Sequence, residues 1–356
     1  MRSLFPVLLV LLTGGLAAAP ADVPPPADAH VVKLVRPTKV GNRFNEITTA
    51  HYEQTVLTRQ DKGVLETETE KSSVHIDIDQ EVLAVTPKGA PKSYRLEVKE
   101  FTRTTAKGRE VLFKPGTVII GKANANDSDF RLEGDDEEID ESKQGILADL
   151  FGMSDKDEPV SMDDLYGTNK PRAIGEARPI DQNVALQWFR NPADPRMIVG
   201  ISGESRLVKI AEIDGQKCYA FGHTTSVRSR SNMQMQQFAQ APESHYLSAM
   251  LILLPVDNTS MERGYTSMKR NRYISPANDG PPDRKNEVIV DSTYETAIKP
   301  LPPAPPKPAT DDVEKPASPK HGKPAGKRPG QQVEPDERAI PAEDAGEDGE
   351  REDQES

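Results

Sequence analysis

The side chains with the clearest capacity for chemistry are the carboxylates gathered between Asp127 and Asp164. This segment holds 15 acidic residues and only three basic ones, which is a balance of −12. Carboxylate oxygens are the ligands that Ca²⁺ and Mg²⁺ prefer in proteins. The densest run is therefore a candidate for loose binding of a divalent cation, and the alternative is a solvated run of charge. It consists of Asp135, Asp136, Glu137 and Glu138.

A dedicated calcium loop is not predicted in this segment. Residues Asp127–Glu138 have the length of an EF-hand loop and carboxylates at several of its ligand positions. However, Leu132 stands where the sharp turn of such a loop requires glycine, and Arg131 occupies a ligand position. We therefore expect no dedicated metal site here.

Two glycine motifs begin like nucleotide-binding and hydrolase signatures and do not complete them. Gly116–Lys122 matches the start of a P-loop, but Ala123 follows where Mg²⁺ binding needs a hydroxyl group. The inner residues of this motif favour a strand, because most of them are β-branched. Gly200–Gly203 begins like a nucleophile elbow, but Glu204 stands in place of the final glycine. Neither segment is predicted to bind a nucleotide or to carry a nucleophile.

A thiol site is not predicted either. Cys218 is the single cysteine, and His223 and His245 are the histidines that could form a dyad with it. Cys218 lies in a strand-like run with Tyr219 and Phe221, so we expect a buried structural thiol. Six scattered histidines and one cysteine lack the spacing of a zinc site. We predict no catalytic residue and no cofactor.

The elements that would position these residues are mostly strands. Apolar and polar residues alternate with a period of two along much of residues 30–298, which is typical of strands with one buried face. The clearest examples are the runs around Val74–Asp79 and Tyr94–Lys99, followed later by Tyr246–Val256, Tyr265–Ile274 and Glu287–Ile298.

One hairpin and two short helices stand out. Residues Arg206–Ile213 and Cys218–Val227 flank Asp214-Gly215, the dipeptide that a two-residue type I′ turn requires. Gly145–Phe151 and Asp181–Phe189 are predicted to be helical, the second with Asp181 as its N-cap.

A weak duplication is visible in two short motifs. Pro37–Gly41 and Pro171–Gly175 share the order proline, two residues, a β-branched residue and glycine, each where a block of strands begins. A true duplication predicts two similar sheets, which either pack together or continue as one curved sheet. The alternative is one continuous sheet with a long acidic insertion. The expected fold is thus a mainly β antiparallel meander, forming a curved open sheet or two packed sheets.

The N-terminus has the layout of a cleavable secretory signal. Arg2 supplies a positive charge, Leu4–Leu12 is an apolar run, and Ala19–Ala21 forms an A-x-A cleavage site. The run is shorter than the ~20 apolar residues that cross a bilayer. We expect cleavage after Ala21, and a soluble exported chain, periplasmic or extracellular, with no membrane span. No lipidation is expected, because the only cysteine is Cys218 and none stands directly after the signal.

The C-terminal end has the composition of a disordered segment. From residue 300 onwards it holds 12 of the 31 prolines and no aromatic residue, so it cannot bury enough apolar surface to offset chain entropy. Its charge is segregated into a basic stretch, Lys315–Arg328, and an acidic one, Glu334–Ser356. The charge balance of the acidic segment over residues 127–164, which is −12, equals the formal net charge of the whole chain. The rest of the chain is therefore about neutral. We expect no nucleic-acid partner, because no basic surface stands out.

These features divide the chain into six expected segments. They are a signal peptide over 1–21, an N-terminal linker over 22–36, a first β half over 37–122, an acidic and partly disordered insertion over 123–170, a second β half over 171–298, and a tail over 299–356.

The stretch Lys39–Phe44 leads with Val40-Gly41 into a long strand, and the Asp-Gly hairpin of Arg206–Val227 follows much later. In these features the sequence resembles exported bacterial β-rich domains of unknown function, over residues 30–298. That resemblance implies the fold and no activity. We expect a non-catalytic binding or interaction module of the cell envelope, with a protein or wall polymer as partner. One alternative is a carrier that holds an apolar ligand in a half-barrel lined by Tyr246–Val256, and another is an enzyme of unknown type.

Overall fold

The computed structural model describes the part of the chain that lies within Met1–Pro305. The described residues are 28–36, 38–60, 63–124, 128–134, 138–153, 155, 160–189, 196–231, 243–276 and 284–303. The predicted signal peptide, Asp135–Glu137 of the candidate cation cluster and most of the predicted tail lie outside them.

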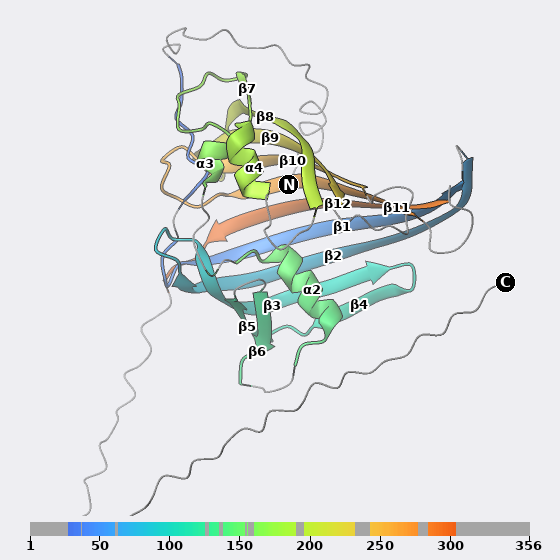
Figure 1. Ribbon diagram of the computed structural model, residues 1–356. Coiled ribbons are helices and arrows are strands. Elements are labelled where there is room, and N and C mark those ends of the chain that lie inside the picture. The colour runs from blue at the N-terminus through green and yellow to red at the C-terminus, as the bar shows by residue number, and fades with distance from the viewer. Residues whose placement is uncertain are drawn as a thin grey trace, which may run out of the picture. The chain divides into compact units, whose positions relative to one another are not determined.

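Twelve antiparallel strands form a single open sheet, which confirms the mainly β antiparallel fold and excludes two packed sheets. Its order is β6-β5-β3-β2-β1-β12-β11-β10-β9-β8-β7, with β4 paired to β3 (Figure 1). The strands are β1 Arg43–Gln60, β2 Gly63–Val85, β3 Pro91–Thr105, β4 Gly108–Phe113, β5 Val118–Ala123, β6 Ser128–Leu132, β7 Ala177–Pro179, β8 Arg196–Ile213, β9 Gln216–Ser231, β10 Glu243–Pro255, β11 Gly264–Pro276 and β12 Lys285–Pro300.

The pairing of β1 with β12 joins the two halves of the sheet. In each half, strands that are close in the sequence lie side by side. The first strand of the first half, β1, pairs with the last strand of the second half, β12, in a ladder from Phe44↔Pro300 to Arg59↔Lys285. Side chains along β1 point alternately to the two faces of the sheet, and the two faces differ in burial. Phe44, Glu46 and Thr48 are buried on one face, while Asn45 and Ile47 on the other are only half-buried.

The described helices all lie on the first of these faces, which we call the covered face. They are α2 Glu141–Leu150, α3 Met162–Leu165 and α4 Gln182–Phe189. Figure 1 shows α2 in front of the first half of the sheet and α3 and α4 in front of the second half. Asp181 accepts hydrogen bonds from the backbone amides of Asn183 (2.9 Å) and Val184 (3.1 Å), as predicted for the N-cap of α4.

Two apolar clusters hold these helices to the covered face. The first joins Leu147 and Leu150 of α2 to side chains such as Ile76 and Ile78 of β2. The second joins Leu165 and Ala185 of α3 and α4 to side chains that include Phe221 of β9. Burial of these residues supplies the main driving force for the fold.

The structure differs from the expected segment boundaries at two places. Within 123–170, β6 pairs with β5 and α2 packs on the first cluster, so this part of the acidic segment belongs to the first half. Within 22–36, the described residues contact the body of the protein. The buried carboxylate of Asp163 accepts hydrogen bonds from the amides of Leu34 (2.8 Å) and Val35 (3.4 Å). Both segments contain apolar residues that pack against the rest of the protein. The overall composition of the segments does not reveal them.

The turns before β1 and β7 have the same hydrogen bonds. Gly41 and Gly175 both have positive φ, 82° and 85°, which favours glycine. The amide of Gly41 donates to Val82 O (2.8 Å), and that of Gly175 donates to Leu207 O (2.7 Å). These are the residues of the two repeated motifs, apart from Pro37, which lies outside the described residues.

The strands after these turns repeat a further feature. The register of β2 shifts between Val82 and Ala84, and that of β8 shifts between Leu207 and Lys209. In both strands the extra residue directly follows the residue whose carbonyl group accepts the hydrogen bond from the turn glycine, which is Val82 in β2 and Leu207 in β8. The shared turn and bulge support a duplication.

No helix among the described residues is long and apolar enough to cross a membrane.

A polar seam as candidate functional site

A row of polar side chains crosses the covered face between the two apolar clusters. We call it the polar seam, and it runs mainly along the central strands β1 and β12. Its inner end consists of Glu46, Thr48, Gln80 and Thr296, and its outer end consists of Tyr52, Asp149, Lys269 and Tyr294. Such a set is unusual at the centre of a sheet face, where apolar residues normally pack.

The inner end is a closed chain of hydrogen bonds around a buried carboxyl group. Gln80 Nε2 lies 2.5 Å from Glu46 Oε2, and Thr48 Oγ1 lies 2.9 Å from Glu46 Oε1. The hydroxyl of Thr48 is also 2.8 Å from that of Thr296 on the neighbouring strand. Glu46, Thr48 and Gln80 are each less than one-tenth exposed. The geometry thus holds both carboxyl oxygens of Glu46 in place.

Burial controls the protonation of this carboxyl group. Desolvation raises the pKa of Glu46 to about 7, against the lowering effect of its bonds to Thr48 and Gln80. No cation among the described residues forms an ion pair with it. Burial also raises the pKa of Tyr265 to about 12, and the adjacent charge of Glu46 adds to that shift. The carboxyl group of Glu46 therefore gains or loses its proton near neutral pH.

The outer end is centred on Asp149 of α2, whose side chain is partly exposed, while Tyr294 is buried. Its Oδ2 accepts hydrogen bonds from the hydroxyls of Tyr52 (2.8 Å) and Tyr294 (2.7 Å). Lys269 Nζ lies 3.9 Å from Asp149 Oδ1 and 4.7 Å from the centre of the Tyr294 ring. The positive charge of Lys269 thus already lies beside this carboxylate. The arrangement ties α2 to β1, β12 and β11.

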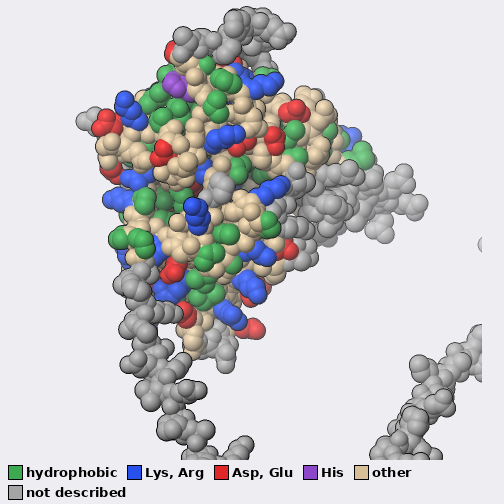
Figure 2. Space-filling view, turned by 90° about the vertical axis from the view of Figure 1, so that its left-hand side faces the viewer, with side chains coloured by type: hydrophobic (Ala, Val, Ile, Leu, Met, Phe, Trp, Pro, Cys, Tyr) green, Lys and Arg blue, Asp and Glu red, His purple; other side chains and the backbone are tan. Residues whose placement is uncertain are grey.

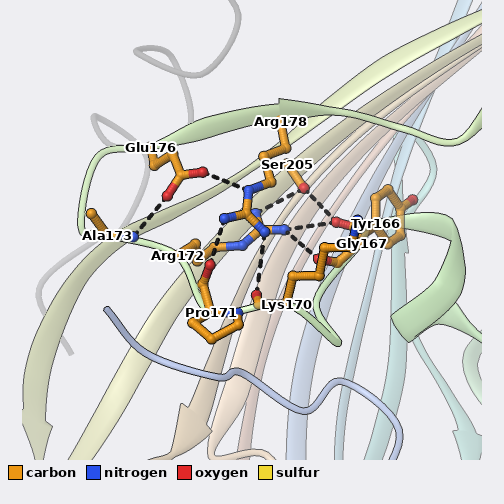
Figure 3. A network of polar contacts seen from close by, with 9 residues as sticks. All are labelled: Tyr166, Gly167, Lys170, Pro171, Arg172, Ala173, Glu176, Arg178 and Ser205. Carbon is orange, nitrogen blue, oxygen red and sulfur yellow. Dashed lines mark hydrogen bonds and ion pairs between the residues drawn. The ribbon is translucent and has the colours of Figure 1, made fainter. Parts of the chain in front are cut away.

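A second polar group lies in the other half, around two arginines (Figure 3). Arg172 is fully buried, and its Nη atoms donate to Ser205 Oγ (3.0 Å) and to Tyr166 O (2.8 Å). Burial lowers the pKa of Arg172 to about 10. Arg178 donates to the Glu176 carboxylate at 2.6 Å and to carbonyls of the same loop. The two guanidinium groups bind backbone oxygens, which is a structural task, since they hold the loop after α3 against β8.

His223 lies beside this group with both ring nitrogens unbonded among the described residues. Its ring stacks on Tyr166 with centroids 4.1 Å apart. Burial lowers the pKa of His223 to about 3, so the ring is neutral. An inaccessible imidazole with no acid or nucleophile bonded to it has no geometry for catalysis.

The residues of the sequence motifs belong to neither polar group, although the ring of His223 contacts Tyr166. Residues Val118–Ala123 of the P-loop-like motif form β5, and the elbow-like Gly200–Gly203 lies inside β8. Cys218 is fully buried, and it and His223 lie an odd number of residues apart on β9, so they face opposite sides of the sheet. Of the candidate cation cluster only Glu138 is described, and the described residues include no group of ligands that could hold a metal ion.

Sequence analysis did not identify the polar seam. Glu46 reads as an ordinary polar residue of an alternating strand, and Asp149 as one of many carboxylates in an acidic segment. One signal was available, because Glu46 and Thr48 stand at positions of β1 that share a face with the apolar Phe44 and Ala50.

Comparisons with known proteins place this chain in no family. No family model matches it, and no curated protein matches it. Among solved structures, OpdQ of Pseudomonas aeruginosa is similar with 8% identity, a TM-score of 0.19 and coverage of 73% of this chain and 98% of that one. P47 of Clostridium botulinum A2 is similar with 9% identity, a TM-score of 0.13 and coverage of 71% and 81%. At these TM-scores neither likeness carries an argument about fold or function.

Proposed function

We propose that this chain is a non-catalytic binding module of the cell envelope, which presents the face of its sheet opposite to the helices to a protein or a wall polymer. One observation carries the proposal. All described helices cover one face, while the opposite face of β1, β2 and β12 is half-exposed and polar along much of its length. We call this the opposite face.

Cross-strand bonds hold the side chains of the opposite face in fixed positions. Arg270 binds Asp291 through two bonds of 2.6 and 2.9 Å. Arg59 and Arg272 each bind Glu287 at 2.6 Å. Fixed side chains lose little conformational entropy when a partner binds, so such a face is suited to recognition.

The charge of the protein surface supports a partner other than nucleic acid. Figure 2 shows Lys and Arg side chains interspersed with Asp and Glu over one side of the molecule. Mixed charge of this kind does not supply the run of cations that neutralises phosphates.

The covered face supports a binding module over an enzyme or a lipid carrier. The seam carboxyl of Glu46 is buried and bonded by neighbouring side chains, so it is not presented to a substrate. Ile252 of β10, in the segment expected to line a ligand cavity, is instead buried in a cluster of the protein's own side chains. Mass spectrometry of an organic extract of the purified protein tests the carrier, which a stoichiometric lipid would revive.

Co-sedimentation tests the proposal. Protein without residues 1–21 is mixed with purified peptidoglycan sacculi and, separately, with envelope membranes. We expect saturable binding to one of the two fractions. The Arg270→Asp/Asp291→Arg double variant keeps the ion pair but inverts its polarity, and it should bind severalfold more weakly at unchanged thermal stability. The matched control is Arg103→Glu/Glu110→Arg, which inverts an exposed pair on β3 and β4. Absence of binding to both fractions, or equal losses in both variants, would contradict the proposal.

A further inference from the structure

The outer edge of β8 is largely unpaired among the described residues. β8 spans 18 residues, Arg196–Ile213, and pairs along its whole inner edge with β9. On the outer edge, β7 pairs only with Glu204, Ser205 and Arg206. Two flanking bonds, from Gly175 to Leu207 and from Ile180 to Gly203, extend this contact by one residue at each side. Residues 196–202 therefore present their outward backbone groups without a described partner strand.

Apolar side chains line this open stretch. Met197 and Val199 are each 54% exposed, which is high for side chains of this size within a long strand. The register of β8 shifts between Ile198 and Gly200, so Val199 is an extra residue that stands out of the ladder.

An exposed cation lies across the same stretch. Arg228 of β9 is exposed, and no ion pair joins it to a carboxylate among the described residues. Its guanidinium group reaches over β8 at Gly200, where a Cβ atom would lie 3.1 Å from Nη2. Glycine at this position lets the positive charge approach the open edge. The neighbouring Arg230, in contrast, is paired with Glu243 at 2.6 Å.

The opposite end of the sheet is bordered by β6 and by β4, which pairs with β3. Its edge strand β6 is only five residues long, and Arg131 within it already bridges to Glu138. Short edge strands with an occupied edge are the usual protection against unwanted pairing.

We propose that residues 196–202 of β8 receive an extended peptide segment of a partner protein, which adds as a strand and places a carboxylate against Arg228. Main-chain bonds to an open edge supply affinity in this mode of recognition, and side-chain contacts supply specificity. The inference rests on the proposed function as a binding module and assigns a second surface to it. A second copy of this chain is disfavoured as occupant, because antiparallel pairing of two β8 edges brings two Arg228 side chains together.

The probe is a fluorescein-labelled nonapeptide of alternating valine and glutamate, and the control peptide has lysine in place of glutamate. Fluorescence polarisation should show saturable submillimolar binding of the acidic peptide only. Arg228→Glu should weaken binding of the acidic peptide about tenfold or more and should bind the lysine peptide instead. This exchange of preference cannot arise from misfolding. Hydrogen exchange should slow in residues 196–202 on binding, with no change in β6.

Several results would overturn this assignment. They are equal binding of both peptides, unchanged affinity of the Arg228→Glu variant, protection outside β8, or a concentration-dependent dimer protected at residues 196–202. If the peptide does not bind while co-sedimentation is normal, only the proposal for the β8 edge is contradicted. If the peptide binds while co-sedimentation fails, the proposal for the opposite face is contradicted and the proposal for the β8 edge stands.

Discussion

Glu46 holds a carboxyl group out of water, and its proton links the free energy of unfolding to pH. Its pKa is about 7 in the fold, mainly through burial, against an ordinary value of 4.5 for glutamate in water. The folded state therefore loses stability as pH rises from about 4.5 through 7, because ionisation is easier in the unfolded chain. The total loss is about 3 kcal/mol, the equivalent of the pKa difference.

The Glu46→Gln variant should lack this loss, since its amide does not ionise. Urea denaturation of both proteins at pH 5 and pH 8 measures the difference. We expect the wild type to fall by about 2.5 kcal/mol relative to the variant, because a small part of the loss already occurs below pH 5. If the free energy of unfolding changed equally in both proteins between the two pH values, Glu46 would be solvated or paired.

His223 should give the opposite dependence. Burial lowers its pKa to about 3 from 6.5, so it stabilises the fold above pH 6.5, and this stability is lost as pH falls toward 3. At pH 5 the loss is about 2 kcal/mol. His223→Leu should remove it, and leucine already occupies the equivalent position of the first half, Leu96. Denaturation of both proteins at pH 7.5 and pH 5 measures the effect. An equal fall in the free energy of unfolding in the variant would contradict the prediction.

At the scale of elements, two glycines should respond with opposite sign to substitution by alanine. Gly145 lies inside α2, and a Cβ there would have no atom within 4 Å. Gly145→Ala should stabilise the protein by about 0.5–1 kcal/mol through the entropy of the unfolded chain. At Gly203 of β8 a Cβ would lie 2.3 Å from Thr224 O, a backbone atom that cannot yield.

Gly203→Ala should therefore destabilise the protein, by about 1–3 kcal/mol or more. Thermal unfolding followed by circular dichroism measures both variants against the wild type. A stabilising or neutral Gly203→Ala would mean that β8 and β9 separate more easily than their ladder indicates.

At the scale of the whole molecule, the β1–β12 ladder should make the two halves unfold together. Trp188, the single tryptophan, lies in α4 and reports on the second half. Ile76 is fully buried in the first half. Ile76→Ala should cost about 2–5 kcal/mol and should shift the unfolding midpoint seen by Trp188 fluorescence as much as that seen by circular dichroism.

Ala173→Ser, at a half-exposed turn position, serves as a control with little expected effect. A Trp188 midpoint that stays at its wild-type value in Ile76→Ala would show that the halves unfold separately and that the ladder does not couple them.

The sequence alone determined the local elements of this protein. Alternation with a period of two predicted the strands, and Asp214-Gly215 predicted a turn whose two residues have positive φ, 48° and 77°. Asp181 predicted the start of α4, because a cap depends only on the next few residues. Only the tertiary structure decided the rest. The β1–β12 pairing joins residues far apart in the chain, and nothing local encodes their register. The same pairing brings Thr48 to Thr296, and burial there gives Glu46 its unusual proton affinity.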